Sequence, residues 1–176
     1  MCLREDIEFR FKRHYKILFR PQDALFSELN KQLCGASHRA IVLWAFGFAE
    51  EIANELAQSY PNEPRPQETI ACARLWACGK IKMPQARRAI LACHALAKEI
   101  SLPKDIALCH ALGQACSTVH SAGHAMGLPL YELTAIVHRF GVSQCEEAIR
   151  RRVREYSERL ADATRAQSGG EWATFL

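Results

Sequence analysis

Cys116, His120 and His124 are the residues whose types and spacing come closest to a chemical site. They recur at steps of four, so the three side chains would share one face of a continuous helix from Lys104 to Met126. Two histidines four positions apart on a helix can bind one zinc ion, and His94 from a neighbouring helix could add a ligand. The glutamate that lies between such histidines in metalloproteases is missing. We favour the alternative, in which these side chains fill a close contact between helices and bind no metal.

Other catalytic arrangements find little support in the sequence. The aspartates stand near expected helix starts or on exposed segments (Asp6, Asp23, Asp105 and Asp162). Glu50 and Glu51 lie where a long apolar helix becomes polar, so we expect both to face solvent. Cys93 and His94 cannot act as nucleophile and base, because neighbours on a helix point about 100° apart. The sequence also lacks a glycine-rich phosphate loop and a nucleophile elbow. We therefore expect neither an enzyme nor a cofactor, with zinc as the alternative.

The elements that would position these side chains are all helices. Apolar residues recur at helical spacing, no segment alternates as a strand does, and prolines and glycines mark the helix ends. The sequence predicts an all-α, single-domain bundle of about seven helices within residues 1–166. Residues 1–35 form an N-terminal helical extension, whose first helix is expected over Leu3–Phe19, and residues 143–166 form the last helix. Residues 167–176 read as a loose tail, although Trp172 and Phe175 could dock it.

The centre of the expected bundle is a hairpin of two helices, Pro84–Ile100 and Lys104–Met126. The second carries Cys109 and Gly113 on one face, and the first carries mostly small residues. Glycine inside a helix costs about 0.5–1 kcal/mol relative to alanine, which implies that a neighbouring helix approaches closely. The eight cysteines are expected to be free thiols that pack as small apolar groups.

The charge of the chain allows an acidic partner but does not indicate nucleic acid. The net charge is +4, and the arginines of the last helix alternate with glutamates, which is typical of a solvated, salt-bridged face. No apolar run is long enough to cross a membrane, and the first residues are charged, unlike a signal peptide. We expect a cytoplasmic protein that binds no membrane and no nucleic acid.

A second group of side chains could form a protein interface. Arginines and a histidine stand at helix starts or near tryptophans, where they could pair with carboxylates inside the fold or across an interface. The members of this group are His38, Arg39, Arg65, Arg74 and Arg87.

Together with other single residues, these positions resemble a family of bacterial all-helical immunity proteins that occur beside polymorphic and contact-dependent toxins. The residues that carry the resemblance are Ser37-His38-Arg39, Trp44-Ala45, Arg65-Pro66, Ile70, Arg74, Trp76 to Gly79, Ala86-Arg87, His94, Gly113-Gln114-Ala115, His120 and His124 to Tyr131. They make residues 37–140 the family-like core. The resemblance implies a non-enzymatic inhibitor that binds a cognate toxin, with the second group of side chains as candidate contact positions.

Two other functions stay open at this stage. One is a zinc-binding helical protein, a small hydrolase or a sensor, centred on His120 and His124. The other is an oligomerisation module in which the first and last helices pair in a homodimer, through Phe9, Phe11, Val153 and Tyr156. Because the chain is basic, it would mimic nucleic acid poorly, so we expect that a cognate toxin is not a nuclease blocked by charge mimicry.

Overall fold

The computed structural model describes residues 3–166 and 171–176, and these contain eight α-helices and two short 3-10 helices. No strand occurs among the described residues, which confirms the predicted all-α class. The elements are α1 (Leu3–Lys12), η1 (Ala24–Phe26), α2 (Ser27–Gly35), α3 (His38–Ser59), α4 (Arg65–Ala77), α5 (Met83–Leu96), α6 (Pro103–Ser117), η2 (Ala122–His124), α7 (Gly127–Phe140) and α8 (Glu146–Ala166).

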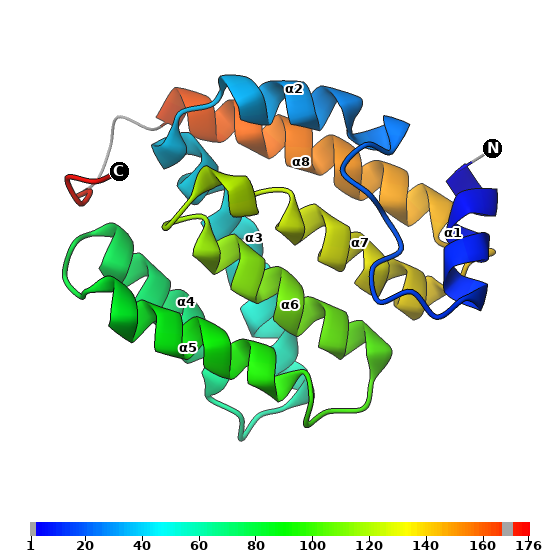
Figure 1. Cartoon of the computed structure of the whole chain (residues 1–176), viewed down its shortest axis with the longest axis horizontal. Coiled ribbons are helices and arrows are strands. Elements are labelled where there is room, and N and C mark those ends of the chain that lie inside the picture. Colours follow the sequence, from blue (N-terminus) through cyan, green and yellow to red (C-terminus); the bar gives the residue numbers. More distant parts are fainter. Residues whose placement is uncertain (1–2, 167–170) are drawn as a thin grey trace.

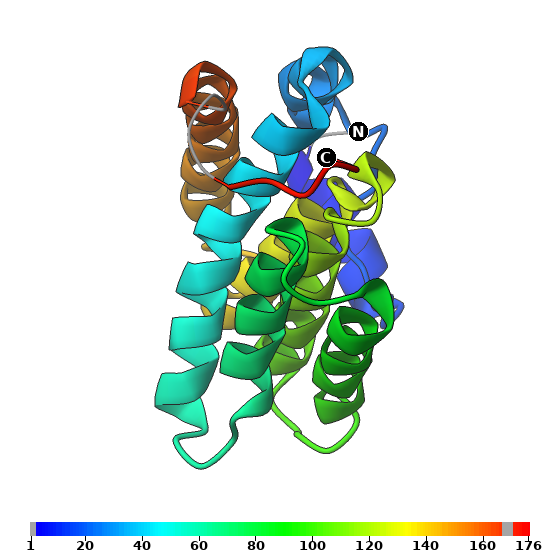
Figure 2. The ribbon, with the colours of Figure 1, turned by 90° about the vertical axis from the view of Figure 1, so that its left-hand side faces the viewer.

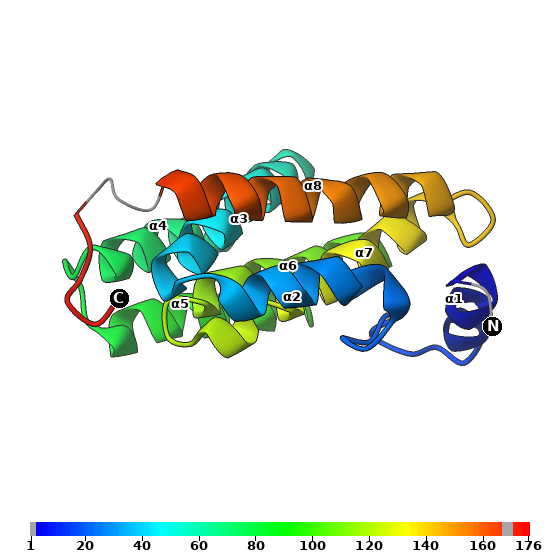
Figure 3. The same ribbon diagram turned by 90° about the horizontal axis from the view of Figure 1, so that it is seen from above.

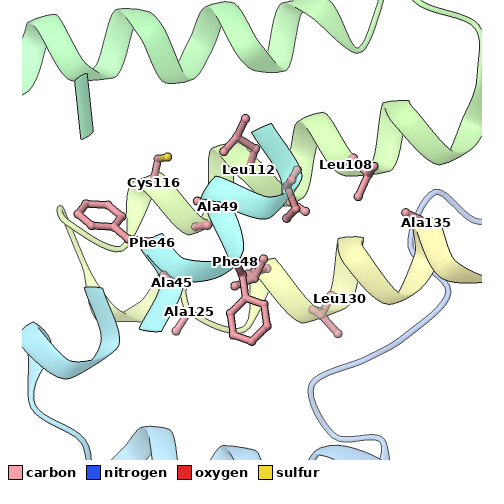
Figure 4. Close-up of a cluster of buried hydrophobic side chains, with 14 of the residues drawn as sticks. Ala45, Phe46, Phe48, Ala49, Leu108, Leu112, Cys116, Ala125, Leu130 and Ala135 are labelled. Carbon is pink, nitrogen blue, oxygen red and sulfur yellow. The ribbon is translucent and has the colours of Figure 1, made fainter. Parts of the chain in front are cut away.

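Helix α3 runs through the interior because its first half is apolar on every side. It begins at the predicted cap, where the Ser37 hydroxyl accepts a hydrogen bond from the Ala40 amide at 3.2 Å. Trp44 and Phe48 are buried, and the indole N–H of Trp44 donates to the carbonyl of Tyr156 in α8. Figure 4 shows Ala49 of α3 close to Leu112 of α6 within the same buried cluster. A buried helix of this kind fixes the positions of the helices around it.

Helices α4, α5 and α6 lie side by side along one half of the molecule (Figure 1). The close contact predicted between α5 and α6 is present: the Cys93 thiol lies 3.5 Å from the carbonyl oxygen of Cys109. At Gly113, a Cβ atom would lie 2.4 Å from the ring of His94, so any larger residue would require this imidazole to move. Helix α6 is the inner arm of this hairpin, since it also packs against α3, α4 and α7, whereas α5 is the outer arm.

Helix α8 packs against α2, α3 and α7 on the opposite half of the molecule (Figures 1 and 3). The buried carboxylate of Glu132 in α7 accepts hydrogen bonds from the Arg152 guanidinium and, at 2.6 Å, from the Tyr156 hydroxyl. The alternating charges of α8 form ion pairs as predicted, namely Arg150 with Glu146, Arg152 with Glu51, Glu132 and Glu155, Arg159 with Glu51 and Glu155, and Arg165 with Asp162. These contacts leave Tyr156 fully buried, so the predicted use of Tyr156 in a dimer surface is wrong.

The first helix is shorter than the predicted Leu3–Phe19. It ends at Lys12, and His14 adopts a left-handed backbone conformation with φ of 55°. The chain then wraps around Arg10, whose guanidinium donates to the Leu18 carbonyl at 2.7 Å and to the Asp23 carboxylate at 2.8 Å. The apolar periodicity of the segment therefore continues beyond the helix, because the extended residues after it also bury side chains.

The sixth helix also ends early, at Ser117, where a continuous helix to Met126 was predicted. The hydroxyls of Ser117 and Thr118 bond back to the carbonyls of Gly113 and Ala115, at 2.7 and 2.6 Å. Such local hydrogen bonds compete with the helical pattern. The chain turns and forms the 3-10 helix η2, so His120 and His124 do not continue the face that carries Cys116.

The tail was expected to be loose unless Trp172 and Phe175 docked it, and it is docked over residues 171–176. Figure 2 shows this segment crossing the end of the bundle. The amide of Ala173 donates to the carbonyl of Ala77 at 2.8 Å, and the Ala173 side chain packs over Gly79, which has φ of 72°. Phe175 contacts Trp76 with ring centres 6.1 Å apart. Residues 167–170 lie outside the described part of the chain.

Within residues 3–166 and 171–176, no helix combines the length and the apolar character that a membrane span requires. The seven cysteines of this part of the chain carry free thiols, as predicted (Cys34, Cys72, Cys78, Cys93, Cys109, Cys116 and Cys145). Four of them are buried, which agrees with their role as small apolar groups.

Candidate functional site

A half-open pocket of about 360 Å³ lies where the end of α4, the length of α5 and the end of α6 meet η2. We call it the histidine pocket, and its lining consists of Trp76, Met83, Arg87, Ile90, Leu91, His94, Gln114, Ser117, His120 and His124. Four residues singled out from the sequence therefore line one cavity: Arg87, His94, His120 and His124. The expectation that all these histidines fill a dry helix contact is wrong, because His120 and His124 reach an open cavity.

The imidazoles of the histidine pocket are held in different ways. His120 stacks on Trp76 with ring centres 6.3 Å apart and 20° between the planes, and its side chain is exposed. His124 is half-buried, and its Nδ1 lies 3.1 Å from the amide oxygen of Gln114. Because that oxygen can only accept, Nδ1 of His124 carries the hydrogen.

His94 forms a hydrogen bond with His110, a residue that we did not single out from the sequence. The two Nδ1 atoms are 2.9 Å apart, so one donates and the other accepts, and both cannot carry a hydrogen at once. Burial lowers the pKa of His94, and the nearby imidazoles of His110 and His124 lower it further. Burial also lowers the pKa of His110, assisted by the charge of Lys16. The pair is therefore neutral near neutral pH.

A second pocket, of about 490 Å³, lies on the other side of this histidine pair. Its lining includes Tyr15, Lys16, His110, Tyr131 and His138, from the segment after α1 and from α6 and α7. The rings of His110 and Tyr131 lie 5.0 Å apart. The His94–His110 hydrogen bond thus forms part of the wall between two cavities.

Cys116 does not belong to the histidine pocket. It is buried in the core, in the same cluster as Phe46 of α3 (Figure 4). Burial raises the pKa of its thiol well above the ordinary value. No group of three or more His, Cys, Asp or Glu side chains in the described part of the chain is arranged to hold a metal ion. The zinc site proposed from His94, Cys116, His120 and His124 is therefore not assembled, because α6 ends before the two later histidines.

Three of the other predicted contact residues make internal contacts. Arg65 forms ion pairs with Glu63 and Glu99 at 2.7 and 2.6 Å, and Arg74 pairs with Glu50 at 2.7 Å. The Nε2 of His38 donates to the Thr118 carbonyl at 2.6 Å, which joins the start of α3 to the end of α6.

Arg39 is half-buried, with its guanidinium carbon 6.0 Å from the centre of the Trp172 ring. Arg87 is exposed at the rim of the histidine pocket, and no carboxylate of the described residues pairs with it. Of the five predicted contact positions, Arg87 alone lines that pocket, so the fold does not gather these positions into one surface.

Sequence reasoning missed two buried acidic residues. Asp105 lies near a helix start, as predicted, but its burial was not foreseen: it accepts from the Tyr60 hydroxyl at 3.0 Å and pairs with Lys104 at 2.6 Å. Glu132 was not singled out, although it anchors α8 through Arg152. Burial raises the pKa of Glu132, while Arg152 acts in the opposite direction. Helical spacing gave no signal here, because both residues lie on otherwise apolar faces.

These features define an all-helical protein with a surface pocket that is rich in imidazole groups and edged by a guanidinium with no carboxylate partner among the described residues. The sequence profile described as "Imm-5 like putative immunity protein" matches residues 31–159. The chain therefore belongs to this family of immunity proteins. The matched range extends past residue 140 into α8, further than the resemblance noted from single residues. No curated protein matches the chain, and no solved structure matches it.

Proposed function

We propose that the chain is a non-enzymatic immunity protein that binds one cognate bacterial toxin in the cytoplasm and neutralises it by covering part of its surface. The family match supports an immunity role in general, and the exposed face of α5 supports protein binding in particular. Met83, Arg87 and Leu91 recur at steps of four on this face. Met83 and Leu91 are 42% and 51% exposed, so this face offers apolar surface on both sides of Arg87 for a partner to cover.

The cysteines support a binding role over a catalytic one. Burial raises the pKa of Cys116 and of Cys145, so both thiols stay protonated near neutral pH. The thiolate is the nucleophilic form of cysteine, and these two residues would have very little of it. Cys93, which is next to His94 in the sequence, points its thiol towards the Cys109 carbonyl instead.

The charge of the chain narrows the kind of toxin. With a net charge of +4, the protein would repel the basic surface by which nucleases bind nucleic acid. We propose that the toxin presents an acidic or mixed surface, and that a nuclease blocked by nucleic-acid mimicry is not the partner. The histidine pocket, with the exposed guanidinium of Arg87 at its rim, is the surface that such a toxin would contact.

The test uses the protein encoded directly upstream of the gene of this chain, where the toxin of an immunity protein is expected. Cells that express this neighbour are expected to stop growing and to recover when the chain is co-expressed, and the two purified proteins are expected to bind with 1:1 stoichiometry in calorimetry. A double variant, Met83→Glu with Leu91→Glu, should fold but lose binding and protection. The matched control is Arg88→Glu, an exposed position on α5 outside the pocket lining. Failure of the wild-type chain both to bind and to protect would contradict the proposal.

The homodimer remains a prediction, now without Tyr156. Phe9 and Phe11 of α1 are 47% and 37% exposed and could still meet a second copy. Sedimentation equilibrium of the chain alone, and of a Phe9→Glu variant, tests it. A monomer at all accessible concentrations would exclude this contact.

A further inference from the structure

The histidine pocket has a one-sided charge. The ionisable groups that line it are Arg87, His94, His120 and His124, and no aspartate or glutamate is among the lining residues. Every one of these groups either carries positive charge or gains it on protonation. A negatively charged group is therefore the complementary occupant, since it would neutralise the guanidinium and favour protonation of the imidazoles.

The donors in this pocket are available to a ligand. Arg65 and Arg74 pair with glutamates of the chain itself, whereas no carboxylate of the described residues pairs with Arg87. His120 makes a ring stack with Trp76, and neither of its nitrogens has a hydrogen-bond partner in the described part of the chain. A guanidinium presents a planar pair of N–H groups that fits the two oxygens of a carboxylate.

The rim of the pocket indicates that the carboxylate belongs to a protein. Met83 and Leu91 flank Arg87 and are exposed, and the indole of Trp76 lies below His120. Tryptophan, methionine and arginine are the residue types enriched at the centres of protein interfaces. A free inorganic anion would satisfy the charges but would leave this apolar rim uncovered. The volume of about 360 Å³ is at the small end of ligand pockets, enough for one or two side chains.

We infer that the histidine pocket is a receptor for a single aspartate or glutamate side chain of the partner protein, whose carboxylate binds between Arg87 and His120 while the apolar rim covers the neighbouring residues. This inference rests on the proposed function, because it names the chemistry by which the toxin is recognised. Gln114 and His124 form the inner wall, and His94 closes the bottom of the pocket against Gly113.

The first test needs no toxin. N-acetyl-glutamate-N-methylamide is titrated into the full chain while the ring signals of the seven histidines are followed by NMR. The signals of His120 and His124 should shift and saturate in the millimolar range, whereas the glutamine analogue, which has the same shape without the charge, should leave them in place. Arg87→Ala should remove the response, and Arg88→Ala should keep it. Equal responses to both analogues, or an unchanged response in Arg87→Ala, would overturn the inference.

The second test uses the neighbouring toxin. Loss of a charge-assisted hydrogen bond costs about 10- to 100-fold in affinity, so Arg87→Ala should weaken toxin binding by about that factor, and Arg87→Glu by more. Arg88→Ala should change the affinity less than about twofold. Tight toxin binding that is the same in Arg87→Ala would refute the carboxylate receptor and leave the immunity function intact. A chain that binds the glutamate analogue through Arg87 but never binds the toxin would refute the immunity function and support the carboxylate chemistry of the pocket.

Discussion

Replacing Gly113 with alanine is expected to disturb the contact between α5 and α6 at one identified place. The new Cβ would lie 2.4 Å from Cε1 and from Nε2 of His94, so the imidazole must move. Its freedom to move is limited, because its Nδ1 is bonded to Nδ1 of His110 at 2.9 Å. Helix propensity acts in the opposite direction, since alanine is more favourable than glycine by about 1 kcal/mol inside a helix.

The two effects can be separated in a double-mutant cycle. Overpacking of this kind costs about 1–3 kcal/mol, so Gly113→Ala alone should change the free energy of unfolding by an amount between about zero and a loss of 2 kcal/mol. In a His94→Ala background the clash is absent, and the same change should stabilise the protein by about 1 kcal/mol. The coupling between the two sites should therefore be about 1–3 kcal/mol, and Gly113→Ala should be the more favourable change in the His94→Ala background.

Urea unfolding followed by circular dichroism gives the four free energies. Gly35→Ala is the control, because a Cβ at Gly35 meets nothing within 4 Å, and it should be neutral or slightly stabilising. The NMR signal of His94 should also move in Gly113→Ala and not in Gly35→Ala. A coupling energy below about 0.5 kcal/mol would mean that α5 and α6 are not in the tight contact described above, and would falsify the reasoning.

Three further predictions concern stability. Glu132→Ala leaves the Arg152 guanidinium without its buried partner, which should cost about 3 kcal/mol in chemical unfolding, while a loss below about 1 kcal/mol would show that the other glutamates compensate. Burial lowers the pKa of His94, His110 and His138, so the unfolded chain binds protons first as the pH falls below the ordinary value of 6.5. The free energy of unfolding should therefore decrease on acidification, and an increase between about pH 7 and pH 5 would contradict the burial of these rings. If residues 1–166 form one domain, unfolding curves from tryptophan fluorescence and from circular dichroism should coincide. Two curves with different midpoints would show that this part of the chain unfolds as more than one domain.

The sequence predicts most of the helices because proline and glycine mark their ends. Pro66, Pro84 and Pro103 each lie within the first two positions of a helix, where the missing N–H and the fixed φ are tolerated. Ser37 caps α3 as expected. These signals are local, so a single sequence is sufficient to read them.

The errors arise where local polar contacts override the apolar pattern. The spacing of Cys116, His120 and His124 suits a helix, but the hydroxyls of Ser117 and Thr118 end it by bonding to carbonyls of the preceding turn. At the other end of the chain, the side chain of Arg10 holds the residues after α1 in an irregular turn. Both cases depend on contacts that periodicity does not describe.

The sequence identified four of the residues that line the candidate site, but it did not predict that they lie together in one pocket. Arg87, His94, His120 and His124 were all singled out, but they were divided between a metal site and a set of interface positions. The pairing of His94 with His110 had a signal in the sequence: Cys93-His94 and Cys109-His110 are the same dipeptide on the two arms of an antiparallel hairpin. The repeat alone does not fix the pairing, because His94 lies two residues before the end of α5 at Leu96, whereas His110 lies seven residues after the start of α6 at Pro103.

The docking of residues 171–176 has a practical consequence for fusion proteins. Phe175 lies against Trp76, the ring that supports His120, and the chain ends beside the histidine pocket. An affinity tag or reporter joined after Leu176 would thus emerge at the rim of that cavity and crowd whatever approaches it. Helix α1 lies at the far end of the molecule from this tail (Figure 1), so a reporter attached ahead of α1 would leave the pocket free.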